Sequence, residues 1–296
     1  MPLAFRGIAW LLLAESCYVV MRLGTRTNAG ILPWPVLAAA RFLGGAVVVA
    51  LAAWWNGASL RVQDRRGTWM RSIFGSGSAV GVFYALGTKR IAVGDATTLS
   101  ATAPFFVALL SKPLLGEPVT RRVEAAIAIG FLGAAILVSP SFHSAAPVAL
   151  LALAGAASYA IAMIWLRRVG PNESSYAVAL HVSLLSGSIM VAIAIAGFAS
   201  GAFPMPTEPP HWFALAAAAA GGGLGQIAVT RAFALEKAAT LGAVSYVGVA
   251  MTYVSEAVVL GHAPGPLQLV GAALIVVAGV LTVTRERVVA VADEES

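Results

Sequence analysis

The sequence predicts an all-α membrane protein with ten transmembrane helices arranged as two inverted five-helix repeats. Three observations lead to this fold class: the apolar composition, a series of ten apolar spans, and an uneven distribution of Lys and Arg between the connecting loops. Of the 296 residues, 59% are hydrophobic and 11% are charged, against about 45–50% and about 25% in soluble domains. Mean hydropathy is +0.86. This composition excludes a soluble domain and a disordered chain.

The apolar spans are long enough to cross a bilayer, which takes roughly 20 residues per helix. They are continuously apolar, whereas the strands of a membrane β-barrel alternate between apolar and polar residues, so each span is predicted to be a helix. The spans are predicted at residues 5–21, 34–55, 69–88, 94–115, 123–139, 147–166, 175–198, 211–232, 239–260 and 265–284.

The Lys and Arg residues predict the orientation. With both termini in the cytoplasm, 14 of the 19 basic residues fall on the inner side, and Arg41 lies within a span. Only Arg22, Arg26, Lys89 and Arg90 fall outside. Cytoplasmic loops carry an excess of basic residues, so we expect an inner (plasma) membrane protein with cytoplasmic termini. The net charge of +6 then reflects topology rather than nucleic-acid binding.

The two halves of the sequence resemble each other at an offset that drifts slowly from 142 to 145 residues. Gly77 and Gly81, for example, meet Gly221 and Gly225 at an offset of 144. We therefore expect repeats at 1–142 and 143–284, followed by a solvated cytoplasmic tail at 285–296. Five spans per repeat place the second repeat upside down relative to the first. Inverted repeats form alternating-access transporters, whose site lies between the halves.

Three segments carry a family resemblance: YAL at 84–86, APFFVALL at 103–110 and LLGEP at 114–118. The second half repeats the last of them loosely as VLGH at 259–262, with His262 in the place of the glutamate. This pattern resembles the ten-helix EamA-type branch of the drug/metabolite transporter superfamily. The resemblance implies secondary transport of small metabolites such as amino acids, nucleosides, vitamins or organic ions, in either direction. It also implies that helices one to four and six to nine surround a central cavity.

Two charged residues lie deep inside the spans. Glu15 is about 15 Å from the inner edge of the first span, and Arg41 is about 12 Å from the outer edge of the second. A charge at this depth is costly and usually faces the protein interior. One interpretation is a structural ion pair between them. The other is a binding site, in which Glu15 takes a proton or a substrate ammonium group and Arg41 holds a carboxylate.

Further polar side chains inside the spans are candidate substrate contacts, with ordinary helix packing as the alternative for each. His181 is also a candidate proton relay, although a core histidine with satisfied hydrogen bonds is the favoured interpretation. These candidates are Tyr84, Tyr159, His181, Gln226 and Tyr246.

Glycine and proline mark positions of close packing or bending. Gly77 and Gly81 in the third span, like Gly221 and Gly225 in the eighth, are spaced for close helix contact. These helices are alternatively hinges that expose backbone to cargo. Pro104 lies near the middle of the fourth span, where it removes one helix hydrogen bond and is expected to kink the helix.

Several motifs of enzymes are missing from the sequence. It has no phosphate-binding Gly-x4-Gly-Lys-Ser/Thr loop, no His-Glu-x-x-His and no paired cysteines, which argues against an ATPase, a metalloprotease or a zinc site. We therefore expect no enzymatic activity and no cofactor. The predicted function is secondary transport, more often export, of a small metabolite such as an amino acid or related zwitterion, by alternating access.

Other functions remain open at this point. One is import of a vitamin-like or nucleoside-like metabolite, and another is a membrane-embedded enzyme that modifies lipids. The expected partners are the lipid bilayer, the small-molecule metabolite and, as a candidate coupling ion, the proton. Nucleic acid is not an expected partner, and the sequence is compatible with a monomer or a homodimer.

Overall fold

The computed structural model describes residues 3–87, 99–138, 146–260 and 265–294. Within these ranges it contains ten α-helices of 13 residues or more and no strand beyond an isolated bridge between Ala29 and Leu32. The helices are α1 (Leu3–Thr27), α2 (Trp34–Trp55), α3 (Arg65–Gly87), α5 (Ala103–Leu115), α6 (Arg121–Val138), α7 (Ala146–Val169), α8 (Ser175–Ala199), α9 (Trp212–Leu235), α10 (Ala238–Leu260) and α11 (Pro266–Glu294).

These helices confirm the predicted fold class. In the described ranges, α1, α2, α7, α8, α9 and α10 each contain a stretch that is long and apolar enough to cross a membrane, while α5 and residues 269–281 form shorter apolar helices. The largest extensions beyond the predicted spans are those of α1, which continues to Thr27, and α11, which continues to Glu294. The predicted repeat boundary at 142–143, the start of the fourth span and His262 lie outside the described residues.

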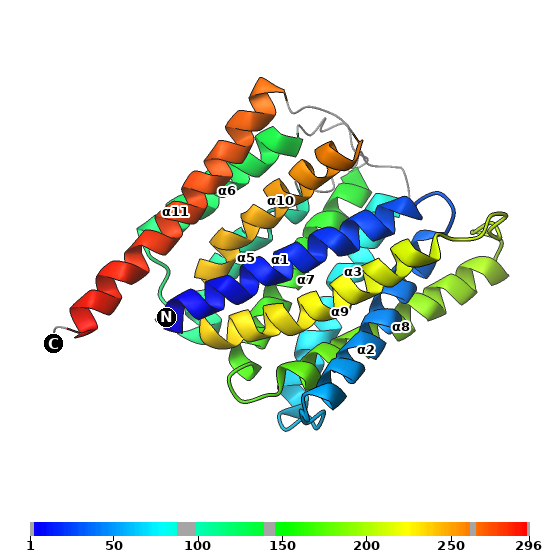
Figure 1. The fold of residues 1–296 in the computed structure, drawn as a ribbon, viewed down its shortest axis with the longest axis horizontal. Coiled ribbons are helices and arrows are strands. Elements are labelled where there is room, and N and C mark those ends of the chain that lie inside the picture. Colours follow the sequence, from blue (N-terminus) through cyan, green and yellow to red (C-terminus); the bar gives the residue numbers. More distant parts are fainter. Residues whose placement is uncertain (1–2, 88–98, 139–145, 261–264, 295–296) are drawn as a thin grey trace.

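The helix contacts follow an approximate two-fold symmetry between the two halves of the chain. Helix α1 packs on α9 and α10, and its counterpart α7 packs on α3 and α5. In the same way, the α2–α9 contact corresponds to the α8–α3 contact. Three helices also contact their own counterparts, in the pairs α2–α8, α5–α10 and α6–α11. Helix α1 begins and α11 ends at the same end of the bundle (Figure 1).

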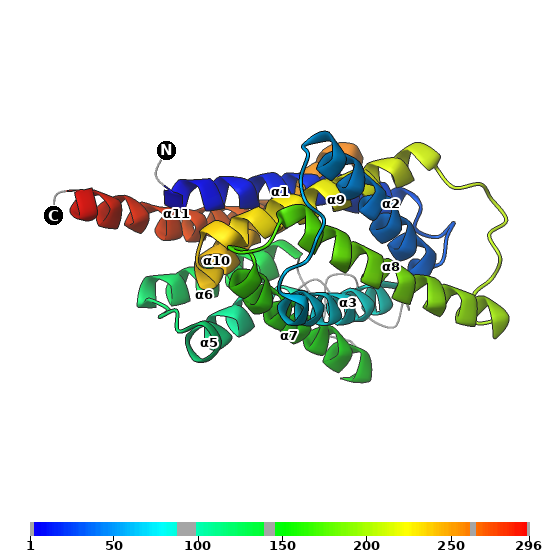
Figure 2. The same ribbon diagram turned by 90° about the horizontal axis from the view of Figure 1, so that it is seen from below.

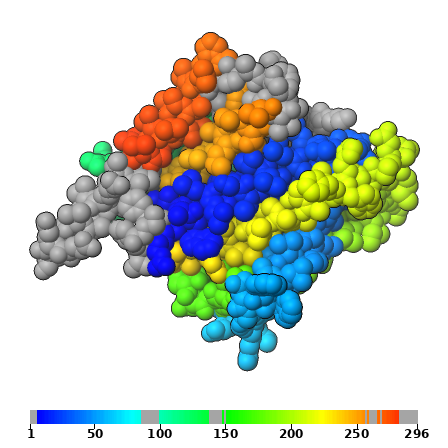
Figure 3. All heavy atoms as spheres, in the orientation of Figure 1, coloured from blue at the N-terminus to red at the C-terminus, as the bar shows by residue number. Residues whose placement is uncertain are grey.

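Two groups of four helices result from these contacts. One contains α1, α2, α9 and α10, which lie side by side on the face seen in Figure 3. The other contains α3, α5, α7 and α8, and Figure 2 shows α3, α5 and α7 in a separate layer from α1 and α9. The pair α6 and α11 packs along one side (Figure 1). Any ligand site between the groups is therefore lined by both halves of the chain.

Glycines allow the closest of these contacts. A side chain at Gly221 would overlap the backbone of α1 at Cys17, and one at Gly225 would overlap the ring of Tyr18. In the other group, Gly81 lies against the backbone of Gly155 in α7. Small residues let helix backbones approach one another in membranes. The glycines of α3 and α9 thus lie at the two symmetry-related contacts α3–α7 and α1–α9.

Pro104 does not bend a continuous helix. Helix α5 begins at Ala103, so that Pro104 lies in its first turn, where a missing N–H costs no hydrogen bond. The backbone turns at 101–102 just before it, and Phe105 donates to the carbonyl of Thr102. This break frees the carbonyl of Ala101, which accepts a hydrogen bond of 2.9 Å from the Tyr246 hydroxyl.

Tyr246 should therefore stabilise the fold through this hydrogen bond. Tyr246→Phe leaves the Ala101 carbonyl without its partner, and we expect a loss of about 1–2 kcal/mol. The measurement is the apparent melting temperature of the purified protein in detergent at one heating rate. The matched control is Tyr84→Phe, because the Tyr84 hydroxyl makes no hydrogen bond to the described residues. Equal melting temperatures for the two variants would contradict the assignment.

Candidate functional site

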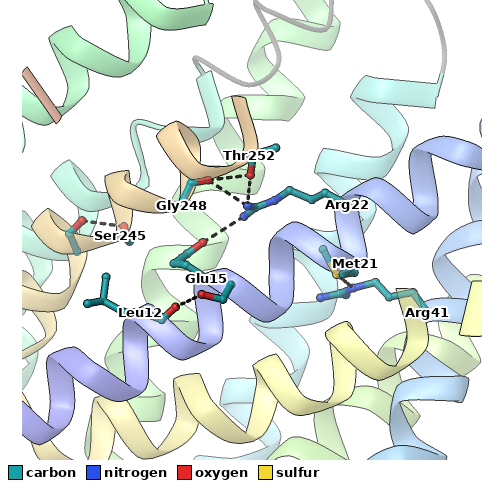
Figure 4. Close-up of polar contacts among 10 residues, drawn as sticks. Leu12, Glu15, Met21, Arg22, Arg41, Ser245, Gly248 and Thr252 are labelled. Carbon is teal, nitrogen blue, oxygen red and sulfur yellow. Dashed lines mark hydrogen bonds and ion pairs between the residues drawn. The ribbon is translucent and has the colours of Figure 1, made fainter. Parts of the chain in front are cut away.

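Glu15 forms an ion pair on the face of α1 that meets α10. Its Oε2 lies 3.4 Å from Nη2 of Arg22, two helical turns further along α1. Arg22 also donates to the Thr252 hydroxyl at 2.6 Å and to the Gly248 carbonyl at 3.4 Å (Figure 4). Any side chain at Gly248 would overlap the Glu15 carboxylate, which is buried there. A glycine in α10 therefore provides the space for this carboxylate.

Arg41 has a different environment and forms no ion pair with Glu15, which was one of the two interpretations of these buried charges. Its Nε donates a hydrogen bond to the thioether sulfur of Met21 (Figure 4), and its guanidinium carbon lies 4.1 Å from the centroid of the Phe42 ring. No carboxylate of the described residues lies within 4.0 Å of it. The reason is the length of α1, which reaches Thr27 and thereby carries Arg22 on the same face as Glu15.

Arg71 is a buried charge that the sequence interpretation assigned to the inner side of the membrane. It is 2% exposed, and its Nη2 donates to the Gln226 side-chain oxygen at 3.3 Å. Its Nε has no hydrogen-bond partner among the described residues. The side chain runs along α3 to Gly75, where any side chain would overlap it. Because Arg65 and Arg66 lie nearby, Arg71 looks in the sequence like a third basic residue at a helix end. The sequence signal that Arg71 is buried is Gly75, one helical turn later, which leaves room for its side chain.

Two tyrosines complete this group. Tyr18 and Tyr159 lie close to each other and within electrostatic range of the charges of Glu15, Arg41 and Arg71. Tyr159 keeps 38% of its surface accessible among these otherwise buried groups, as does the Arg22 side chain. We call the whole set the central cluster, and it consists of Glu15, Tyr18, Arg22, Arg41, Arg71, Tyr159 and Gln226.

Helix α9 positions much of the central cluster. Gly222 faces the Arg41 side chain, Gly225 faces the ring of Tyr18, and Gln226 binds Arg71. Gly222 and Gln226 are four residues apart, so they lie on the same face of α9 about one turn, or about 6 Å, apart along its axis. The glycine-rich stretch therefore lets α1 and α2 each approach α9 closely, and it places the two arginines at neighbouring positions along this helix.

Three of the predicted site residues lie away from the central cluster. Tyr84 stacks edge-on against Trp34 near the end of α3. Tyr246 is buried against Gly130 of α6. His181 is half-buried, with its Nδ1 2.8 Å from the Ser72 hydroxyl and its ring edge-on to Trp69. The structure brings Glu15, Arg41, Tyr159 and Gln226 together.

The glutamate of the LGEP segment joins the two halves of the chain. Glu117 accepts a hydrogen bond of 2.7 Å from Nε of Arg167 at the end of α7 and one of 3.2 Å from the backbone N–H of Ala238. Arg167 in turn donates to the carbonyls of Phe233 and Ala234 at the end of α9, each at 3.2 Å. This junction fixes the ends of α7, α9 and α10 relative to the α5–α6 loop.

Comparison with known proteins agrees with this architecture. The model of the EamA-like transporter family matches residues 5–139 and again 146–284. The pseudopaline exporter CntI from Pseudomonas aeruginosa strains UCBPP-PA14 and PAO1 is 28% identical over 273 residues, covering 92% of this chain and 94% of the relative.

A protein of known crystal structure shares the fold, with a TM-score of 0.82 at 21% identity over 94% of this chain and 96% of that chain. Among the described residues, no group of three His, Cys, Asp or Glu side chains is placed to hold a metal ion. The family match covers both halves of the chain, and it identifies a multi-pass membrane transporter of small molecules rather than an enzyme. The chain belongs to the EamA-like transporter family.

Proposed function

We propose that this protein is a secondary transporter that exports an amino-acid-related zwitterion by alternating access, with cargo bound at the central cluster. The observation that carries this proposal is the cluster itself, where one carboxylate and three guanidinium groups lie among helices from both halves of the chain. Ionisable groups inside a membrane protein are costly and mark substrate or ion pathways.

The chemistry of the cluster fits a zwitterion. A guanidinium group binds a carboxylate through two parallel hydrogen bonds, and a carboxylate accepts hydrogen bonds from an ammonium group. Glu15 can exchange its contact with Arg22, at 3.4 Å, for a cargo ammonium group or for a coupling proton. The accessible surfaces of Tyr159 and Arg22 are where a solute first reaches these groups.

Direction and mechanism have separate support. The curated relatives are described as exporters, which favours export over import of a vitamin-like or nucleoside-like compound. The two four-helix groups meet at the contacts α2–α8 and α5–α10, each of which joins a helix to its own symmetry counterpart. Rocking of one group against the other around such contacts gives the cluster access to each side of the membrane in turn.

Export should depend on both Glu15 and Arg41. We expect Glu15→Gln and Arg41→Gln each to lower export at least tenfold, since losing one partner of a buried charged contact costs about 2–5 kcal/mol. The measurement is the metabolite content of the medium and of the cells, for cells that express the intact chain or a variant at equal protein level. Glu124→Gln, at an exposed carboxylate of α6, is the matched control.

Three outcomes are distinguishable. A compound that enters the medium with the intact chain and with the Glu124 variant, but not with the other two, supports the proposal. If both Glu15→Gln and Arg41→Gln export at the normal rate, the cluster is not the site. Depletion of a compound from the medium would instead indicate import.

A further inference from the structure

We infer that the cargo carries two carboxylate groups, one bound by Arg41 and the other by Arg71. This inference rests on the proposed function and goes beyond it in naming the class of cargo. An amino acid with one carboxylate would satisfy only one of these arginines, whereas a dicarboxylate would satisfy both.

The charge balance of the central cluster indicates that the cargo carries two carboxylates. Glu15 is paired with Arg22. Arg41 and Arg71 have no carboxylate within 4.0 Å among the described residues, although both are buried. Buried charges in proteins are normally paired, because removing an ion from water without a counter-ion is strongly unfavourable. Two positive charges therefore lack their counter-ions.

The present partners of the two arginines are weak and neutral. Arg41 donates to a thioether sulfur, which is a poor acceptor. Arg71 donates to an amide oxygen at 3.3 Å, and its Nε has no partner among the described residues. A carboxylate would replace either contact with stronger, charge-assisted hydrogen bonds. Both arginines thus have binding capacity that the described residues leave unused.

The spacing of the two arginines limits the size of the cargo. Arg41 lies at Gly222 and Arg71 binds Gln226, so their places on α9 are about one helical turn apart, or about 6 Å along its axis. Two carboxylates separated by a few carbon atoms span this distance. Inorganic phosphate can bridge two guanidinium groups at this spacing and is therefore tested below as the competing ligand, whereas one carboxylate supplies only one of the two negative charges.

The test compares three probes of nearly equal size on the purified full-length protein in detergent. Succinate has two carboxylates, succinamate has one and succinamide has none. The measurement is the rise in apparent melting temperature across a concentration series at constant ionic strength, since a ligand that binds the folded state stabilises it by mass action. Inorganic phosphate is included as a compact dianion.

We expect succinate to bind at least ten times more tightly than succinamate, and succinamide and phosphate to bind more weakly still. Arg41→Gln and Arg71→Gln should each reduce the preference for succinate over succinamate to about one, because only one guanidinium group without a carboxylate partner then remains. Arg231→Gln is the matched control, since Arg231 also lies in α9 but stacks on Trp10 and Tyr176. This control should keep the preference.

Several results would overturn the inference. They are equal binding of succinate and succinamate by the intact chain, no stabilisation by either, tighter binding of phosphate, or a preference that survives in both variants. The order of affinities of the four probes is measured on the intact chain and so does not depend on any variant folding. Arg71→Lys provides a second substitution if Arg71→Gln does not fold. An exported compound with one carboxylate would refute this inference while leaving the proposed function intact. Absence of any exported compound would refute the proposed function.

Discussion

Gly221→Ala should destabilise the protein by about 1–3 kcal/mol, the usual range for overpacking a tight contact. A methyl group at this position would overlap the carbonyl of Cys17 and the backbone nitrogen of Met21 in α1. Backbone atoms cannot rotate away as the end of a flexible side chain can, so α1 and α9 would have to separate. That separation would also displace Glu15 and Tyr18, and we expect export to fall with stability.

The matched control for this substitution is Gly242→Ala in α10. The nearest atom to a methyl group at Gly242 is Cβ of Pro104 at 3.5 Å, an ordinary van der Waals contact. Replacing a glycine inside a helix by alanine is otherwise favourable by up to about 1 kcal/mol. The apparent melting temperatures at one heating rate should fall for Gly221→Ala and stay level or rise for Gly242→Ala. The same change in both variants would show that the α1–α9 contact has no special role.

Glu117→Gln should destabilise the junction between the two halves by about 2 kcal/mol, given that a hydrogen bond to a charged group contributes about 1.5–3 kcal/mol. The substitution removes the charge that attracts Arg167 at 2.7 Å. Arg167 would still be held near the carbonyls of Phe233 and Ala234. The effect should weaken in high salt, because both side chains are partly accessible to solvent.

A double-mutant cycle with Arg167→Gln measures this interaction. If the two side chains stabilise each other, the double variant loses less stability than the sum of the single variants, with a coupling energy of about 1 kcal/mol or more. Glu124→Gln combined with Arg167→Gln is the control pair, for which we expect additive effects. Additivity in the Glu117 cycle as well would show that Glu117 acts only through the N–H of Ala238.

The fold was predictable because the membrane imposes strict conditions on composition. A span must be apolar over roughly 20 residues and must satisfy its backbone hydrogen bonds internally. These conditions make the spans visible in sequence, and eight of the ten described helices begin within three residues of their predicted starts. Helix α3 begins at Arg65 rather than at 69. The start of the fourth span lies outside the described residues, and α5 begins at Ala103 after a turn at 101–102.

Parts of the candidate site were predictable for the same reason. Glu15 and Arg41 are conspicuous because they interrupt apolar spans, and both lie in the central cluster. Arg71 and Arg22 were missed as members of it, since a basic residue near a helix end looks like a topology signal. Gln226 was marked by its glycine-rich neighbourhood, whereas Tyr84, His181 and Tyr246 pack elsewhere.

The sequence by itself determined the class of fold, the repeat and the presence of charges in the membrane, since each of these depends on residue type and spacing along one chain. Only the tertiary structure decided which charges meet. That depends on the rotation of each helix about its axis and on glycines in neighbouring helices, such as Gly248 beside Glu15 and Gly222 beside Arg41. A partner for a buried charge is chosen by geometry across helices, and spacing along the chain does not encode that geometry directly.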